Sequence, residues 1–139
     1  MEAKQFLNQI RDLYKEIEKK KEKIAALEDK LTSISGGFKV GEVVTGSKDG
    51  KSHEKMIIKK LELEDALRED FKRLLILQKS MMKVIDKLNN AEERDILILR
   101  YISGKPWKSI ARYTKINLRR CYRIYNQALI NIEVILDEN

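Results

Sequence analysis

Apolar residues recur at alternating steps of three and four in two long segments of the chain. In residues 2–34 Lys20 interrupts the series, and in residues 54–88 Asp70 does. The first series is Phe6, Ile10, Leu13, Ile17, Ile24, Leu27, Leu31 and Ile34, and the second is Leu63, Leu67, Leu74, Leu77, Met81, Val84 and Leu88. A period of 3.5 residues is typical of a coiled-coil seam. The pattern therefore predicts two long helices, with Phe71 beside Asp70 as the candidate for the missing apolar contact.

Between these helices, residues 35–53 break the apolar pattern and hold five of the six glycines. The segment predicts a loop, and Gly36 is well placed to end the first helix. Such a loop allows the two helices to fold back as an antiparallel hairpin, or to pair with a second copy of the chain. The pattern leaves both arrangements open.

A pair of helices alone has little core, so we expect self-association. Even a hairpin would leave outward apolar residues such as Leu7, Tyr14, Ile57, Phe71 and Leu75. The expected assembly is therefore a homodimer in which the two long helices supply most of the interface.

Residues 46–52, with the sequence GSKDGKS, resemble a phosphate-binding P-loop. That motif has four residues between its glycines, whereas here there are three, and Thr45 stands where a glycine belongs. No α/β pattern surrounds the segment. We interpret it as a polar linker.

Residues 89–139 predict three further helices. Asn90 is a candidate cap for a helix over residues 91–102, and Gly104 ends that helix. Pro106 suits the first turn of a short second helix, because that position needs no amide hydrogen.

The third of these helices is expected from Leu118 to about Leu136, after a turn over residues 114–117 and a cap at Asn117. Its apolar stripe consists of Leu118, Cys121, Tyr125, Ala128, Ile132 and Ile135. A short helix, a tight turn and a longer helix in this order are typical of a helix-turn-helix reader of DNA.

Positive charge gathers on the same region. Between Arg94 and Asn131 nine Lys or Arg stand against one acid, Asp95, while acids and bases nearly balance elsewhere. Arg binds phosphate or guanine, Asn and Gln pair with adenine, and Lys binds phosphate. The candidate DNA-contacting residues are Lys105, Lys108, Arg112, Lys115, Asn117, Arg119, Arg120, Tyr122, Arg123, Asn126 and Gln127.

At these residues the chain resembles a known family. Residues 96–132 look like the DNA-binding helix-turn-helix of domain four of bacterial sigma factors, on the strength of Ile110-Ala111, Ile116-Asn117, Cys121 and Ala128-Leu129. With a long coiled-coil N-terminus ahead of it, the chain is similar to small prophage regulators of Gram-positive hosts, including late-gene transcription activators. The resemblance implies promoter-region DNA binding. Nothing in the chain corresponds to the sigma domain that melts a promoter, so we do not expect a stand-alone sigma factor.

The expected fold is all-α, with a helical hairpin or coiled-coil arm over residues 1–88 and a trihelical helix-turn-helix domain over residues 89–139. The expected function is sequence-specific binding of double-stranded DNA by a transcriptional regulator of phage or prophage type, with RNA polymerase as a candidate partner of the arm. One alternative is a small-terminase-like subunit that recognises DNA for packaging, which a ring assembly would favour. Another is a protein-interaction module that docks on RNA polymerase or another regulator without DNA.

One cysteine and one histidine exclude a disulfide framework and any ordinary metal site. Cys121 is expected in the core, and His53 has no triad partner that the sequence defines. No carboxylates are marked for acid–base chemistry, so we expect no enzyme activity, cofactor or metal. The start lacks an apolar signal core and no apolar run is long enough to span a membrane, which predicts a cytoplasmic protein.

Overall fold

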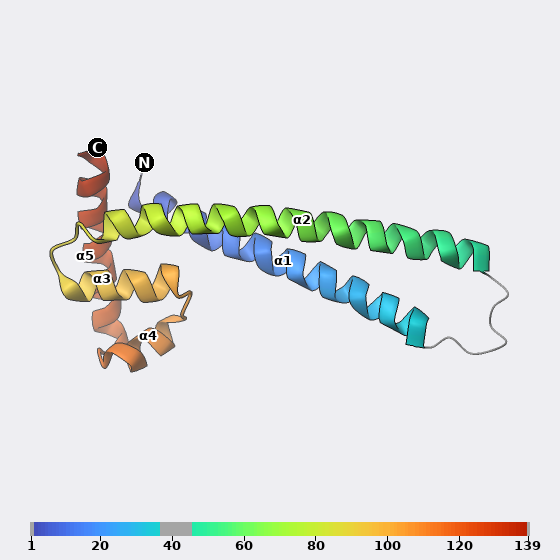
Figure 1. The fold of residues 1–139 in the computed structure, drawn as a ribbon. Coiled ribbons are helices and arrows are strands. Elements are labelled where there is room, and N and C mark those ends of the chain that lie inside the picture. Colours follow the sequence, from blue (N-terminus) through green and yellow to red (C-terminus); the bar gives the residue numbers. More distant parts are fainter. Residues whose placement is uncertain (1, 37–45, 139) are drawn as a thin grey trace. The chain divides into compact units, whose positions relative to one another are not determined.

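The structure is a computed structural model that describes residues 2–36 and 46–138, and within these ranges it contains helices and no strand. Its elements in chain order are α1 (Ala3–Gly36), α2 (Gly46–Ile85), α3 (Ala91–Leu97), the π-helix η2 (Ile98–Ile102), α4 (Trp107–Thr114) and α5 (Leu118–Asp137) (Figure 1). The all-α fold predicted from the sequence is confirmed.

Several boundaries differ from the predicted ones: α2 ends at Ile85 rather than at residue 88, and the predicted helix over residues 91–102 is an α-helix followed by a π-helix. The predicted loop over residues 35–53 is helical at both ends, because α1 continues to Gly36 and α2 already begins at Gly46. The P-loop-like segment is therefore helical, and residues 37–45 lie outside the described residues. The residues after Gly46 lack an apolar period and include Gly50, a weak helix former, so the sequence alone did not predict that α2 begins this early.

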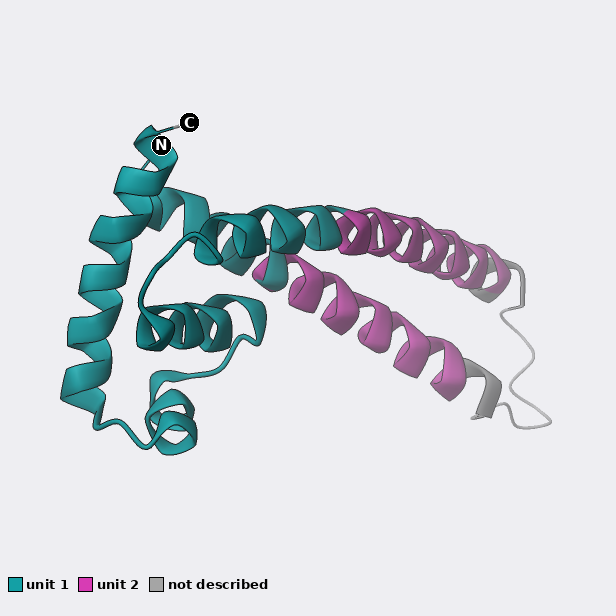
Figure 2. Ribbon diagram, turned by 60° about the vertical axis from the view of Figure 1, so that its left-hand side comes forward, with its two compact units in different colours: residues 1–14, 73–139 teal, residues 15–72 magenta. Residues whose placement is uncertain are grey.

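The chain forms two compact units, residues 1–14 with 73–139 and residues 15–72 (Figure 2). The sequence predicted a domain boundary after residue 88, whereas the boundaries between these two units lie within α1 and α2.

In the unit of residues 15–72, the two helical segments run antiparallel. Lys20 Nζ lies 2.5 Å from a carboxylate oxygen of Asp70, and Lys60 Nζ lies 3.6 Å from one of Glu28. Asp70 is only 3% exposed. The two charged residues that interrupt the apolar seams therefore pair with each other, and this segment is a hairpin within one chain.

Phe71 does not replace Asp70 in the seam, contrary to the expectation from sequence. Its side chain is 39% exposed, and Lys21 Nζ lies 5.7 Å from the centroid of its ring. No apolar residue takes the place of Asp70 in the seam, because Asp70 itself stays there and pairs with Lys20.

In the other unit, Tyr14 joins the first helix to two later segments. Its hydroxyl donates to the carbonyl of Ile102 at 2.8 Å and accepts from Gln78 Nε2 at 3.0 Å. Leu7 is fully buried, so the expectation that it points outward was wrong. The start of α1 belongs to the same compact unit as the C-terminal helices, and this explains the burial of Leu7.

The C-terminal helices enclose a small apolar core. α3 packs against α5, and α4 packs against both α5 and η2. The core consists of Ile96, Leu99, Ile110 and Cys121, with Trp107, Ala111, Ile116, Ile124 and Tyr125 packed against it. Cys121 is a core residue as predicted, and its thiol lies 3.6 Å from the carbonyl oxygen of Ile116 in the turn before α5.

No helix in the described part of the chain is both long and apolar enough to cross a membrane.

Candidate nucleic-acid interface

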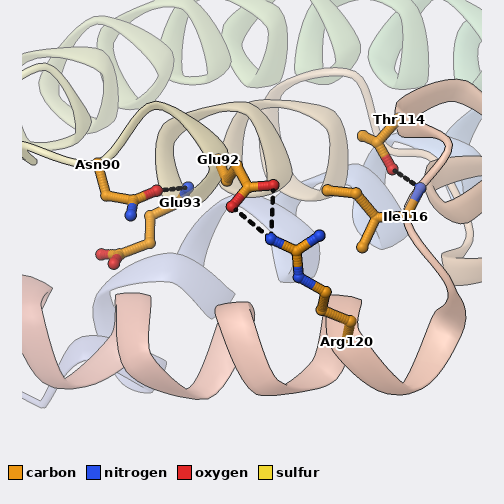
Figure 3. A network of polar contacts seen from close by, with 6 residues as sticks. All are labelled: Asn90, Glu92, Glu93, Thr114, Ile116 and Arg120. Carbon is orange, nitrogen blue, oxygen red and sulfur yellow. Dashed lines mark hydrogen bonds and ion pairs between the residues drawn. The ribbon is translucent and has the colours of Figure 1, made fainter.

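The turn between α4 and α5 is built by local hydrogen bonds. Thr114 Oγ1 donates to the carbonyl of Ile110 at 2.7 Å. It accepts from the amide of Ile116 at 3.3 Å (Figure 3). Lys115, between them, has a φ of 59°, in the left-handed region that often ends a helix. These contacts stop α4 at Thr114 and redirect the chain towards α5.

Asn117 begins α5 as predicted. Its side-chain oxygen accepts a hydrogen bond from the amide of Arg120 at 2.8 Å, and its carbonyl accepts from the amide of Cys121 at 2.9 Å. The cap satisfies one of the amides that a helix start leaves without a partner. Asn117 itself stays exposed, so its side chain fixes the start of α5 at the protein surface.

Every predicted DNA-contacting residue lies at the surface: Lys105, Lys108, Arg112, Lys115, Asn117, Arg119, Arg120, Tyr122, Arg123, Asn126 and Gln127 are all exposed. Residues separated by three, four or seven positions share a helix face. Arg119, Arg123 and Asn126 therefore lie together on the outward face of α5, with Tyr122 at its margin. Cys121, Ala128 and Ile132 are buried on the opposite side.

Arg120 differs from its neighbours because it is held by α3. Its Nη2 atom lies 3.1 Å and 3.2 Å from the two carboxylate oxygens of Glu92 (Figure 3). Both side chains are about half exposed. The sequence grouped Arg120 with Arg119 and Arg123, whereas the structure gives its guanidinium a partner on another helix.

A second polar link joins α5 to α3, and sequence reasoning missed it. Asn131 Nδ2 donates to a carboxylate oxygen of Glu93 at 2.7 Å, and Glu93 is only 5% exposed. Gln127 Nε2 donates to Asn131 Oδ1 at 3.3 Å, so Gln127 extends this network to the surface. Glu93 also donates its amide to the Asn90 cap at 3.0 Å, which confirms the predicted cap of α3.

Lys105 and Arg112, from the loop before α4 and from α4 itself, line the same shallow hollow of about 380 Å³. Tyr113 completes its rim and is 72% exposed. The sequence had not singled out Tyr113, since a lone tyrosine in a short helix gives no distinctive signal. The hollow is lined by two cations and no acid, which suits an anionic ligand group.

Trp107 is a packing residue. Its ring centroid lies 5.0 Å from that of Tyr122 and 4.9 Å from that of Tyr125, and the Arg100 guanidinium lies 4.9 Å above it. Partial burial and the nearby Arg11 lower the pKa of Arg100 below its ordinary value. Tyr122 thus rests on Trp107 while remaining 42% exposed.

Tyr101 lies beneath this aromatic group. It is 1% exposed, and its hydroxyl lies 2.7 Å from that of Tyr125. Burial and this hydrogen bond raise the pKa of Tyr101 well above its ordinary value of 10.0. The hydroxyl pair fixes the end of the π-helix against the middle of α5.

The charged side chains of residues 96–132 are all basic. Residues 96–132 contain eight Lys or Arg and no Asp or Glu, so the rest of the chain has a small excess of acids over bases. In the described residues, no group of three or more His, Cys, Asp or Glu is placed to hold a metal ion. The surface can therefore attract polyanions electrostatically.

Comparisons with protein-family models, with curated proteins and with solved structures gave no match to this chain.

Proposed function

We propose that this protein binds double-stranded DNA through α5 and acts as a transcriptional regulator. The observation that carries the proposal is the outward face of α5, where Arg119, Arg123 and Asn126 are exposed on a capped helix. A helix of this kind, following a short helix and a tight turn, fits the major groove.

The side chains suit two kinds of DNA contact. On α5, Arg119 and Arg123 can each grip guanine with two hydrogen bonds, and Asn126 can do so with adenine. Around the helix, Lys105, Lys108, Arg112 and Lys115 are exposed cations that would bind phosphates and set the orientation of the protein. Arg120 is not needed as a base reader in this arrangement, because Glu92 holds its guanidinium.

The regulatory role rests on the resemblance to domain four of sigma factors. The residues that carry this resemblance have structural roles here: Ile110 and Cys121 are buried in the core, and Asn117 caps α5. A phage-type regulator with a long helical arm is the kind of protein that combines these features. Contact of the arm with RNA polymerase belongs to the same proposal.

The proposal is tested by selecting duplexes from a random-sequence DNA pool with the full-length protein. Fluorescence anisotropy of the selected duplex then gives the affinity. We expect the variant Arg119→Ala/Arg123→Ala to lose discrimination between the selected and a scrambled duplex. Lys59→Ala, which removes an exposed cation from α2, is the matched control and should leave it intact. Failure to enrich any duplex, together with no salt-sensitive binding, would overturn the proposal.

A further inference from the structure

Helix α2 carries a second seam that is exposed to solvent. One seam, through Leu74 and Asp70, is buried within the chain. On another face, six residues of the same continuous helix recur at steps of four and three, namely Ile57, Leu61, Glu64, Arg68, Phe71 and Leu75. Helices with two seams of this period commonly pack against two neighbours at once.

The apolar members of this outer seam are unusually accessible. Leu61 is 55% exposed and Leu75 is 66% exposed, while Ile57 and Phe71 are each 39% exposed. Large apolar residues scattered singly on a surface need no explanation, but a row at coiled-coil spacing marks an interaction surface.

The residue pattern of the outer seam is symmetric about its centre. Counted along the sequence, Ile57 and Leu75 are equally far from residue 66, and so are Leu61 and Phe71. The innermost pair, also equidistant, is an acid and a base, Glu64 and Arg68. An antiparallel pair of such helices would place apolar residues opposite apolar residues and each Glu64 opposite an Arg68.

We propose that the outer seam of α2 pairs antiparallel with the same seam of a second copy, with the two-fold axis at the level of residue 66. Two-fold pairing uses the same patch on both chains and requires that the patch be self-complementary. The seam meets this requirement in shape and in charge. The inference stands apart from DNA binding, since no residue of the C-terminal helices takes part.

The charge pattern also selects the orientation. A parallel pair in register would place Glu64 against Glu64 and Arg68 against Arg68, which is unfavourable on both levels. In the antiparallel pair, the same four side chains form two ion pairs. Arg68 already contacts Asp65 within its own helix, but this pair is exposed and the guanidinium has five donors, so Glu64 of the second copy can share it.

The test is a charge-swap series in the full-length protein, followed by sedimentation equilibrium at micromolar concentration. The wild type should be dimeric. Glu64→Arg and Arg68→Glu should each weaken the dimer by about tenfold or more, because each places like charges opposite one another. The double variant should restore it. Glu62→Arg, an exposed change off the seam, is the control and should have no such effect.

Mixing the two single variants gives the sharpest result. One carries two bases on the seam and the other two acids, so a heterodimer should form at concentrations where each alone is monomeric. Circular dichroism verifies that every variant keeps its helices. A monomeric wild type at micromolar concentration, a dimer insensitive to the swaps, or no heterodimer on mixing would each overturn the proposal.

Discussion

Arg120 and Glu92 form an ion pair between α5 and α3, with one guanidinium nitrogen bonded to both carboxylate oxygens at 3.1 Å and 3.2 Å. The pair directs the Arg120 guanidinium towards α3. It links side chains of the two helices, so the guanidinium is not a free cation.

The first prediction follows from that pair. Arg120→Ala should weaken binding to the selected duplex less than Arg119→Ala or Arg123→Ala does, because a bidentate base contact contributes about 1–3 kcal/mol. Its effect on folding should be about 1 kcal/mol or less, since both partners are half exposed. Anisotropy titrations and urea unfolding measure the two effects. An affinity loss for Arg120→Ala as large as that for Arg123→Ala would contradict the assignment.

The second prediction concerns salt. If five to seven cations of residues 105–123 bind phosphates, the log of the affinity should fall against the log of salt concentration with a slope of about −5 to −6. Lys108→Ala should weaken binding to all duplexes by a similar factor and reduce the steepness of the slope by about one. The control Lys59→Ala should leave the slope unchanged. A flat salt response of the wild type would rule out the phosphate contacts.

The third prediction concerns the part-buried pair Lys20–Asp70. Lys20→Met removes the lysine from the Asp70 carboxylate, whose side chain is 5% exposed, and should cost about 1–3 kcal/mol of unfolding free energy. Asp70→Leu should cost less, because the Lys20 side chain is 24% exposed and can turn its amine to water. The double variant should recover much of the loss. Urea unfolding of all three measures this, and additive losses would show that the residues do not act as a pair.

This pair also shows how far the sequence could predict the fold. Lys20 and Asp70 both stood out as charged interruptions of apolar seams, but nothing in the one-dimensional pattern fixed the register that brings them together. The burial of Leu7 was missed for a related reason, because the pattern treated α1 as one arm, whereas its first turns belong with the C-terminal helices.

At the candidate interface, the sequence predicted contacts between residues close in the chain, but it did not predict contacts between different helices. The caps at Asn90 and Asn117 depend on residues three positions away, and both were predicted correctly. The contacts of Arg120 with Glu92 and of Asn131 with Glu93 depend on how α5 crosses α3. That crossing is set by packing of the whole core, so helical periodicity alone could not reveal that Arg120 has a partner.

The fourth prediction concerns the Asn117 cap. Asn117→Ala should lower the unfolding free energy by about 1 kcal/mol, because the amide of Arg120 loses its side-chain acceptor. Asn117→Asp should retain the cap, since a carboxylate also accepts the bond and interacts favourably with the helix start. The same Asn117→Asp variant should bind DNA less well, because it places a negative charge in the basic region. Equal stability of the Ala and Asp variants in thermal unfolding would contradict the role of the cap.

The last prediction is a loss of stability at alkaline pH that depends on Tyr101. Its pKa is raised in the folded protein, mainly by burial and then by the hydrogen bond with Tyr125, while in the unfolded chain it is close to 10. Above that pH the unfolded chain releases the Tyr101 proton and the folded protein retains it. The Tyr101 contribution is therefore fully present below about pH 10 and declines above it, by at most about 1.4 kcal/mol per pH unit.

Urea unfolding of the wild type, Tyr101→Phe and Tyr113→Phe between pH 8 and pH 11 isolates this effect, because lysines titrate alike in all three. Tyr101→Phe should be less stable than the wild type at pH 8, since Tyr125 loses its hydroxyl partner. The difference should shrink as the pH rises above 10. Tyr113, which is 72% exposed, should give a variant that follows the wild type throughout. A constant difference between wild type and Tyr101→Phe across this range would show that the folded protein does not hold the Tyr101 proton more tightly than the unfolded chain.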